Sequence, residues 1–446
     1  MLKKILATSL LLAAPVAQAA DDHAAGAVHE HRLANGLQLL VWPSHDIPSV
    51  AVYTFFRVGS RNERPGITGL SHFFEHMMFN GTKTRPPGTF DRLLEAAGGN
   101  NNAYTTEDVT VYQDWIPKSA LSLAFDLESD RMRNLDFDPK VVESERGVVY
   151  SERRLRVDND NAAALEELVQ ASAFVAHPYQ IPVIGWPSDI ESWKRSDLQH
   201  YYKTYYAPNN AVMVVAGDVQ PDAVFALADR YYGTIKPSQL PDPVRTTEPP
   251  QAGERRVVLK RPGQAPLLQL AYHAPRAADD AVPALELLLA ILAEGDSSRL
   301  YRLLVEDTRT AVSVQGQLQA GFDPGLAWLN VTLPPGGDVA RVQQQIDEAL
   351  ARVVRDGVTD TELAKARNLK LAQFWKSLST IAGKAQALGH CEVLGGGRAR
   401  LFETPDRYAA VTGDQVRRIA AQVFRADNRT VGVLQPQAQA APGDAP

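Results

Sequence analysis

Two histidines and a glutamate lie within five positions of a mostly apolar segment, GLSHFFEHMMFNGT, residues 69–82. On a helix, His72 and His76 are four residues apart and share one face, while Glu75 flanks them from the side. Neutral imidazole is a good ligand for Zn²⁺, and two ligands on one helical face fix a large part of its tetrahedral site. The segment therefore predicts part of a metal site. The alternative is a core helix whose two histidines are satisfied by hydrogen bonds.

A third ligand is expected from a separate element that is rich in acids. Residues 143–154, ESERGVVYSERR, supply Glu143, Glu145 and Glu152 in an otherwise amphipathic helix. Glu145 and Glu152 are two turns apart and share a face. One of them can bind the metal while the other holds a ligand or the water. A solvated run of charges is the alternative interpretation of this segment.

The order H-x-x-E-H is the inverzincin signature of zinc peptidases. A catalytic zinc site takes three protein ligands and leaves its fourth position to water. Glu75 is better placed to remove a proton from that water than to reach the metal that its neighbours hold. The pattern thus predicts that Glu75 is the general base of peptide hydrolysis and returns the proton to the leaving amine.

Three segments carry a wider resemblance: GLSHFFEHMMFNGT, GGNNNAYTTEDVTVYQ and ESERGVVYSERR resemble the pitrilysin family of zinc peptidases, M16. The resemblance covers nearly all of residues 28–436. It implies one Zn²⁺ per chain, held by His72, His76 and Glu152, with Glu75 as the base and Glu145 as a supporting acid of the catalytic site. In that family the third ligand follows the second histidine by about 76 residues, which is where Glu152 stands.

The stretch NNAYTTED matches the family's Asn-Ala-Tyr-Thr segment, an edge strand on which the substrate backbone pairs as an added strand. By this resemblance Asn102, Ala103 and Tyr104 bind the peptide substrate. By composition alone they mark only the start of a strand.

The second half departs from the family pattern. Family members that work alone, or their partner chains, carry an Arg and a Tyr after the second-domain SRL helix, and these stabilise the oxyanion. Here the corresponding residues are Val305 and Val312, and neither side chain can donate a hydrogen bond. We therefore expect the zinc-bearing subunit of a heterodimer, with a homologous M16 partner that supplies the Arg/Tyr pair. Arg309 is the substitute if the register is shifted.

Two other functions fit parts of the sequence. A non-catalytic M16-like scaffold or chaperone-like assembly subunit is the alternative from another class, but such a protein is expected to lose the ligand set that is complete here. An exported protein with an adventitious metal-binding helix is the third interpretation. It leaves the spacing of Glu145 and Glu152 unexplained.

Composition and the N-terminus bear on location and partners. The 446 residues are 45% hydrophobic and 22% charged, with a net charge of −6, so the electrostatic signature of nucleic-acid binding is lacking. Residues 1–19 place Lys3 and Lys4 before a short apolar run and an Ala-Gln-Ala site, which is typical of a cleaved signal peptide rather than a membrane anchor. We expect a periplasmic protein without a stable membrane anchor. Its only cysteine, Cys391, excludes an intramolecular disulfide.

The elements that must position these residues form two similar halves. Each begins with two β-rich runs around a turn, followed by a helical segment. A proline-rich stretch, residues 236–254, has the composition of a linker. We predict an α+β fold of two homologous α/β-sandwich domains, each a mixed, mainly antiparallel sheet with helices on one face. The domains are expected at residues 28–235, with the metal site, and 255–436, without one, before a disordered tail at residues 437–446.

Overall fold

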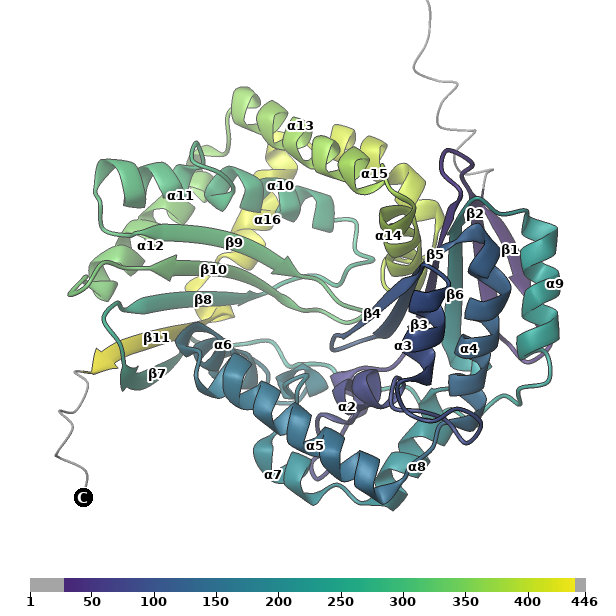
Figure 1. Cartoon of the computed structure of the whole chain (residues 1–446). Coiled ribbons are helices and arrows are strands. Elements are labelled where there is room, and N and C mark those ends of the chain that lie inside the picture. The colour runs from purple at the N-terminus through teal and green to yellow at the C-terminus, as the bar shows by residue number, and fades with distance from the viewer. Residues whose placement is uncertain (1–27, 438–446) are drawn as a thin grey trace, which may run out of the picture.

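Two sheets with their helices make up the part of the chain that the computed structural model describes, residues 28–437 (Figure 1). The expected signal peptide and residues 438–446 lie outside this part, and Gln437, expected to begin the tail, is the last residue of a strand. The first sheet has the order β1-β2-β6-β3-β5-β4. Its strands are β1 (His29–Arg32), β2 (Gln38–Pro43), β3 (Ser49–Phe56), β4 (Asn100–Thr105), β5 (Thr110–Pro117) and β6 (Ala211–Gly217).

The second sheet, β7-β11-β8-β10-β9, repeats the order β2-β6-β3-β5-β4 of the first and has no counterpart of β1 among the described residues. In each half the last strand lies between the first two long ones: β6 is parallel to β2 and antiparallel to β3, as β11 is to β7 and β8. The shared order confirms the predicted duplication of an α+β unit with mixed, mainly antiparallel sheets. The strands of the second sheet are β7 (Arg255–Pro262), β8 (Leu267–His273), β9 (Ser313–Gln319), β10 (Leu326–Thr332) and β11 (Arg429–Gln437).

Helices follow the strands in both halves (Figure 1). Those of the first half are α2 (Leu70–Met77), α3 (Thr89–Ala96), α4 (Leu121–Asn134), α5 (Pro139–Arg153), α6 (Asn161–Ala173), α7 (Pro187–Ser192), α8 (Arg195–Tyr205) and α9 (Pro221–Tyr232). Those of the second half are α10 (Val282–Ala293), α11 (Arg299–Tyr301), α12 (Val339–Asp356), α13 (Asp360–Ser377), α14 (Ile381–Val393), α15 (Ala399–Ala410) and α16 (Gly413–Val423). Short π-helical segments follow α5 and α11, at Arg154–Asp158 (η3) and Arg302–Asp307 (η6). None of the helices in residues 28–437 is long and apolar enough to cross a membrane.

One helix of each half covers the free face of the other half's sheet. Helix α6 packs on β11 and β8, and α14 packs on β6 and β3 (Figure 1). A glycine permits the close approach in both places: a Cβ on Gly432 would lie 2.2 Å from Val169, and a Cβ on Gly389 would lie 2.0 Å from Phe55. The two halves are therefore joined by this exchange of helices as well as by the chain between them.

The connecting segment, residues 236–254, contains no helix or strand. It is nevertheless tied to the first half, because the Glu248 carboxylate accepts backbone N–H groups of Val175, Ala176 and His177 at 2.9–3.1 Å. Three hydrogen bonds to one carboxylate hold the segment against the turn after α6.

A hairpin of the second half also docks on the first half. In the β9–β10 turn, Asp323 pairs with Arg61 at 2.5 Å and its carboxylate lies 3.0 Å from His177 Nε2. Beside it, Asp108 accepts hydrogen bonds from Tyr179 and from the Phe322 backbone N–H. These buried and half-buried polar contacts fix one end of β9 beside the end of β4.

Candidate metal centre and active site

Helix α2 carries the H-x-x-E-H segment. The residue before its first turn, Gly69, has a left-handed backbone conformation that glycine adopts without strain. Gly69 has φ 85°, and the buried Glu63 carboxylate accepts the backbone N–H groups of Gly69 at 2.6 Å and Ser71 at 2.7 Å. These contacts satisfy donors that the first helical turn leaves free. Phe73 and Phe74 are fully buried, so the apolar face of α2 is fixed in the core. The other face presents the polar residues.

His72, His76 and Glu152 converge between α2 and α5. Glu152 Oε2 lies 3.6 Å from His72 Nε2 and 3.3 Å from His76 Nε2, and the three ligand atoms all lie within 4.8 Å of one another. Two imidazoles and one carboxylate are the donor set of a catalytic zinc site with an open fourth position. The residues present therefore fit the ion that the sequence predicts.

Glu145 lies behind His76 and not at the three-ligand cluster. Its Oε1 is 2.8 Å from His76 Nδ1, and its Oε2 accepts a 2.8 Å hydrogen bond from Asn80 Nδ2. A carboxylate on Nδ1 fixes the orientation and tautomer of a histidine that binds metal through Nε2. The structure thus separates the roles of Glu145 and Glu152, which helical spacing left open. Asn80 was not among the predicted residues.

The pKa values of the two histidines are shifted in opposite directions. Burial alone would lower the pKa of His76, but hydrogen bonds and charges from Glu145 and Glu152 raise that pKa to about 9. Burial and the neighbouring His76 charge lower the pKa of His72 to about 4. These opposite shifts favour a charged imidazolium at His76 and a neutral imidazole at His72 at neutral pH, and a zinc ion held by both histidines would displace the extra proton of His76.

Glu75 is held in place by a residue that the sequence analysis did not identify. Thr105 Oγ1 donates a 2.7 Å hydrogen bond to Glu75 Oε2, and burial raises the pKa of Glu75 above its ordinary value. A general base works best with a pKa close to the working pH. The signal for Thr105 was available, since alternation along a strand places it on the same face as Ala103.

Among residues 28–437, strand β4 lies at the edge of the first sheet and pairs only with β5. Asn102, Ala103 and Tyr104 line a cavity of about 580 Å³ together with His72, Glu75 and Glu152. The Tyr104 hydroxyl is already engaged, at 2.8 Å from His390 Nε2 and 2.6 Å from Gln386 Nε2, both on α14. The Tyr104 side chain is thus held by α14 of the other half, whereas the outer backbone edge of β4 has no partner strand among the described residues.

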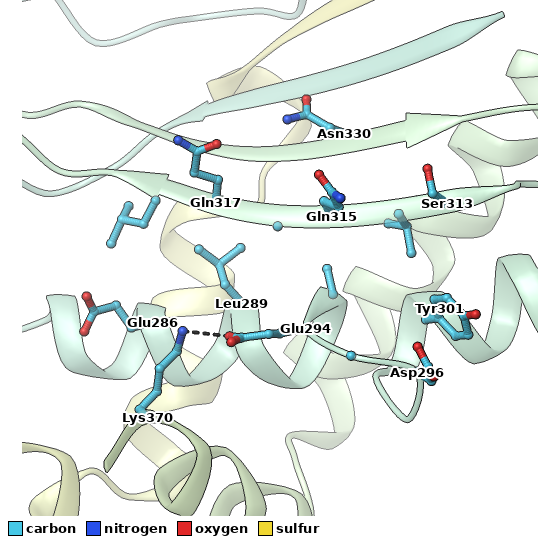
Figure 2. Close-up of a pocket in the computed structure, with 15 residues that line it drawn as sticks. Glu286, Leu289, Glu294, Asp296, Tyr301, Ser313, Gln315, Gln317, Asn330 and Lys370 are labelled. Carbon is cyan, nitrogen blue, oxygen red and sulfur yellow. Dashed lines mark hydrogen bonds and ion pairs between the residues drawn. The ribbon is translucent and has the colours of Figure 1, made fainter. Parts of the chain in front are cut away.

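A cavity of about 650 Å³ occupies the corresponding place in the second half, between α10 and β9 (Figure 2). Gln315 and Gln317 project from β9, and Glu294 pairs with Lys370 at 2.7 Å on the opposite side. Its lining includes no histidine or cysteine. Within residues 28–437, His72, His76 and Glu152 form the one group of three residues of metal-ligating type.

Replacing Glu145 with Gln is expected to weaken zinc binding by about 10- to 100-fold, because a neutral amide holds the His76 N–H less strongly. Competition with a chromophoric chelator measures this affinity. Glu143→Gln is the matched control, since the Glu143 side chain lies on the same helix but is 73% exposed and, among the described residues, pairs only with Arg146. Equal affinities for both variants would contradict the role of Glu145.

The duplicated α+β fold, with H-x-x-E-H on one helix and a third acidic ligand on another, defines the class of inverted-motif zinc peptidases. Two family models match the chain: "Insulinase (Peptidase family M16)" over residues 41–186 and "Peptidase M16 inactive domain" over residues 192–370. The chain belongs to peptidase family M16.

Its relatives share most of its length. The zinc protease PqqE of Helicobacter pylori is 31% identical over 392 residues, which are 85% of this chain and 88% of that protein. A Bacillus subtilis relative named uncharacterized zinc protease YmxG is 26% identical, over 88% of this chain and 95% of its own length. The crystal structure of a protease from Helicobacter pylori superposes with a TM-score of 0.88 at 28% identity, covering 92% of this chain and 99% of that one. The periplasmic protease PqqL of Escherichia coli shares the fold, with a TM-score of 0.77 at 18% identity, over 92% of this chain and 48% of PqqL.

Proposed function

We propose that this chain is a zinc-dependent endopeptidase that hydrolyses short or unfolded peptides. The observation that carries the proposal is the convergence of His72, His76 and Glu152 beside Glu75, at the unpaired edge of β4. Membership of M16 and the names of the relatives support it.

The chain's own residues define most of the reaction path. A substrate in extended conformation adds to β4 as a further strand, which places its backbone along the cavity that Glu75 lines. Zinc, when bound there, supplies a Lewis acid that polarises the peptide carbonyl and acidifies water. Glu75, oriented by Thr105, removes the proton from the attacking water. It then returns that proton to the nitrogen of the breaking C–N bond, and the amine leaves.

We also propose that the chain works outside the cytoplasm, as the zinc-bearing subunit of a heterodimer. The signal-like residues 1–19 support export, and the relative PqqL of Escherichia coli is described as periplasmic. The partner proposal follows from side-chain chemistry: Val305 is half-buried against the second core and Val312 is exposed, and neither can donate to an oxyanion. A homologous M16 chain would supply the missing Arg/Tyr pair.

The isolated chain is expected to bind zinc but to cleave a quenched unfolded peptide at least about 100-fold more slowly than with its partner, since loss of one oxyanion donor costs about that much. Co-purification from the periplasmic fraction of the native source supplies the partner. The double substitution Val305→Arg with Val312→Tyr should raise the activity of the isolated chain. Full activity of the chain alone would overturn the heterodimer.

A further inference from the structure

Arg156 is the only lysine or arginine among the described residues that line the cavity at His72, Glu75 and β4. Peptide hydrolysis places negative charge on the carbonyl oxygen, and sites of this kind meet that charge with fixed hydrogen-bond donors. Val305 and Val312 supply none from the second half. A cation in the same cavity as the base Glu75 is therefore a candidate hydrogen-bond donor to the oxyanion within this chain.

The position of Arg156 is fixed by the ligand cluster. It lies in η3, directly after α5, and is four residues beyond Glu152, so the two share a face. Its Nε is 3.0 Å from Glu152 Oε1, whereas Glu152 Oε2 faces the two histidines. One carboxylate therefore contacts both the guanidinium and the metal-ligand atoms, which holds the cation at the rim of the candidate centre.

The rest of the guanidinium is available. Within the described residues Nη1 and Nη2 make no hydrogen bond or ion pair. The side chain is 73% exposed, and Arg156 is one of the residues that line the cavity. An exposed pair at this spacing contributes little to stability, so the contact with Glu152 does not by itself explain an arginine here. Arg154 on the same segment is exposed and does not line the cavity. Among the described lysines and arginines, only Arg156 combines free guanidinium N–H groups with a place on the cavity that Glu75 lines.

We propose that Arg156 is a catalytic residue whose Nη groups donate hydrogen bonds to the scissile carbonyl oxygen as it becomes an oxyanion. The inference rests on the proposed peptidase function. No proton leaves the guanidinium: water adds to the carbonyl carbon, Glu75 carries the water's proton to the leaving nitrogen, and Arg156 stabilises the negative oxygen in between. Arg156 thus gives the isolated chain its basal activity, and a partner's Arg/Tyr pair acts on the same oxygen in addition.

The test compares Arg156→Ala and Arg156→Lys with Arg154→Ala, all loaded with saturating zinc. We expect Arg156→Ala to lower kcat by about 10²- to 10³-fold and to weaken binding of a phosphinic peptide, an anionic tetrahedral analogue, by a similar factor. Binding of the uncleaved parent peptide, measured calorimetrically in a Glu75→Gln background, should change little. Added methylguanidine should restore part of the activity, and Arg154→Ala should behave as wild type.

Four outcomes would overturn the assignment. If Arg156 only holds Glu152, Arg156→Ala weakens zinc binding, and phosphinic peptide affinity returns to normal at saturating zinc. If it binds a substrate's terminal carboxylate, Arg156→Ala loses only the preference for peptide acids over peptide amides. If the zinc-loaded wild type neither cleaves peptides nor binds the phosphinic peptide, the proposed function fails and this role fails with it. If the wild type behaves as expected and Arg156→Ala is unaffected, only the role proposed for Arg156 is wrong and the proposed function stands.

Discussion

Glu75→Gln is expected to lower kcat by about 10²- to 10⁴-fold while one zinc per chain remains bound. Glutamine keeps the size of the side chain and can still accept the hydrogen bond from Thr105, but it cannot take a proton from water. Glu75 does not belong to the three-ligand group, so metal content should not change. Hydrolysis of a quenched peptide and zinc analysis on the same sample measure both effects.

The matched control is Glu95→Gln, which removes one exposed carboxylate from α3 at the same change in net charge. Retained turnover in Glu75→Gln would show that another group is the base. A simultaneous loss of zinc would instead place Glu75 among the residues that hold the metal. If both the wild type and Glu75→Gln bind zinc and peptide but neither cleaves the peptide, the non-catalytic scaffold is favoured.

His72→Asn is expected to reduce bound zinc from one ion per chain to nearly none after dialysis. Loss of a direct ligand should exceed the 10- to 100-fold cost of losing an outer partner. Burial keeps His72 neutral, and its Nδ1 has no hydrogen-bond partner among the described residues. The side chain is therefore ready to bind a metal through Nε2 and makes little other polar contact that the substitution would break.

Elemental analysis and calorimetric zinc titration measure this loss, and peptide cleavage should fall in parallel. His200→Asn removes an exposed histidine from α8 and should leave zinc content unchanged. If His72→Asn keeps one tightly bound zinc, the ion binds elsewhere and the site built from α2 and α5 is wrong. Because excess zinc can mask a weakened site, both variants are compared over a range of free zinc concentrations.

The part of the site that lies on α2 can be predicted from the sequence because it depends only on the spacing of residues along one helix. His72 and His76 face the same side of α2 by their spacing, and the apolar residues around them seat the helix in the core. The duplicated fold was likewise visible in the repeated order of strands and helices. Neither inference requires knowledge of how distant elements pack.

Contacts between distant elements had to come from the tertiary structure. Spacing made Glu145 and Glu152 equivalent on one face of α5, and the packing of α5 on α2 decided that Glu152 meets both histidines while Glu145 supports His76. Packing of β4 on α2 likewise brings Thr105 to Glu75. Local periodicity specifies the face of a helix, but the partner of that face is set by long-range packing.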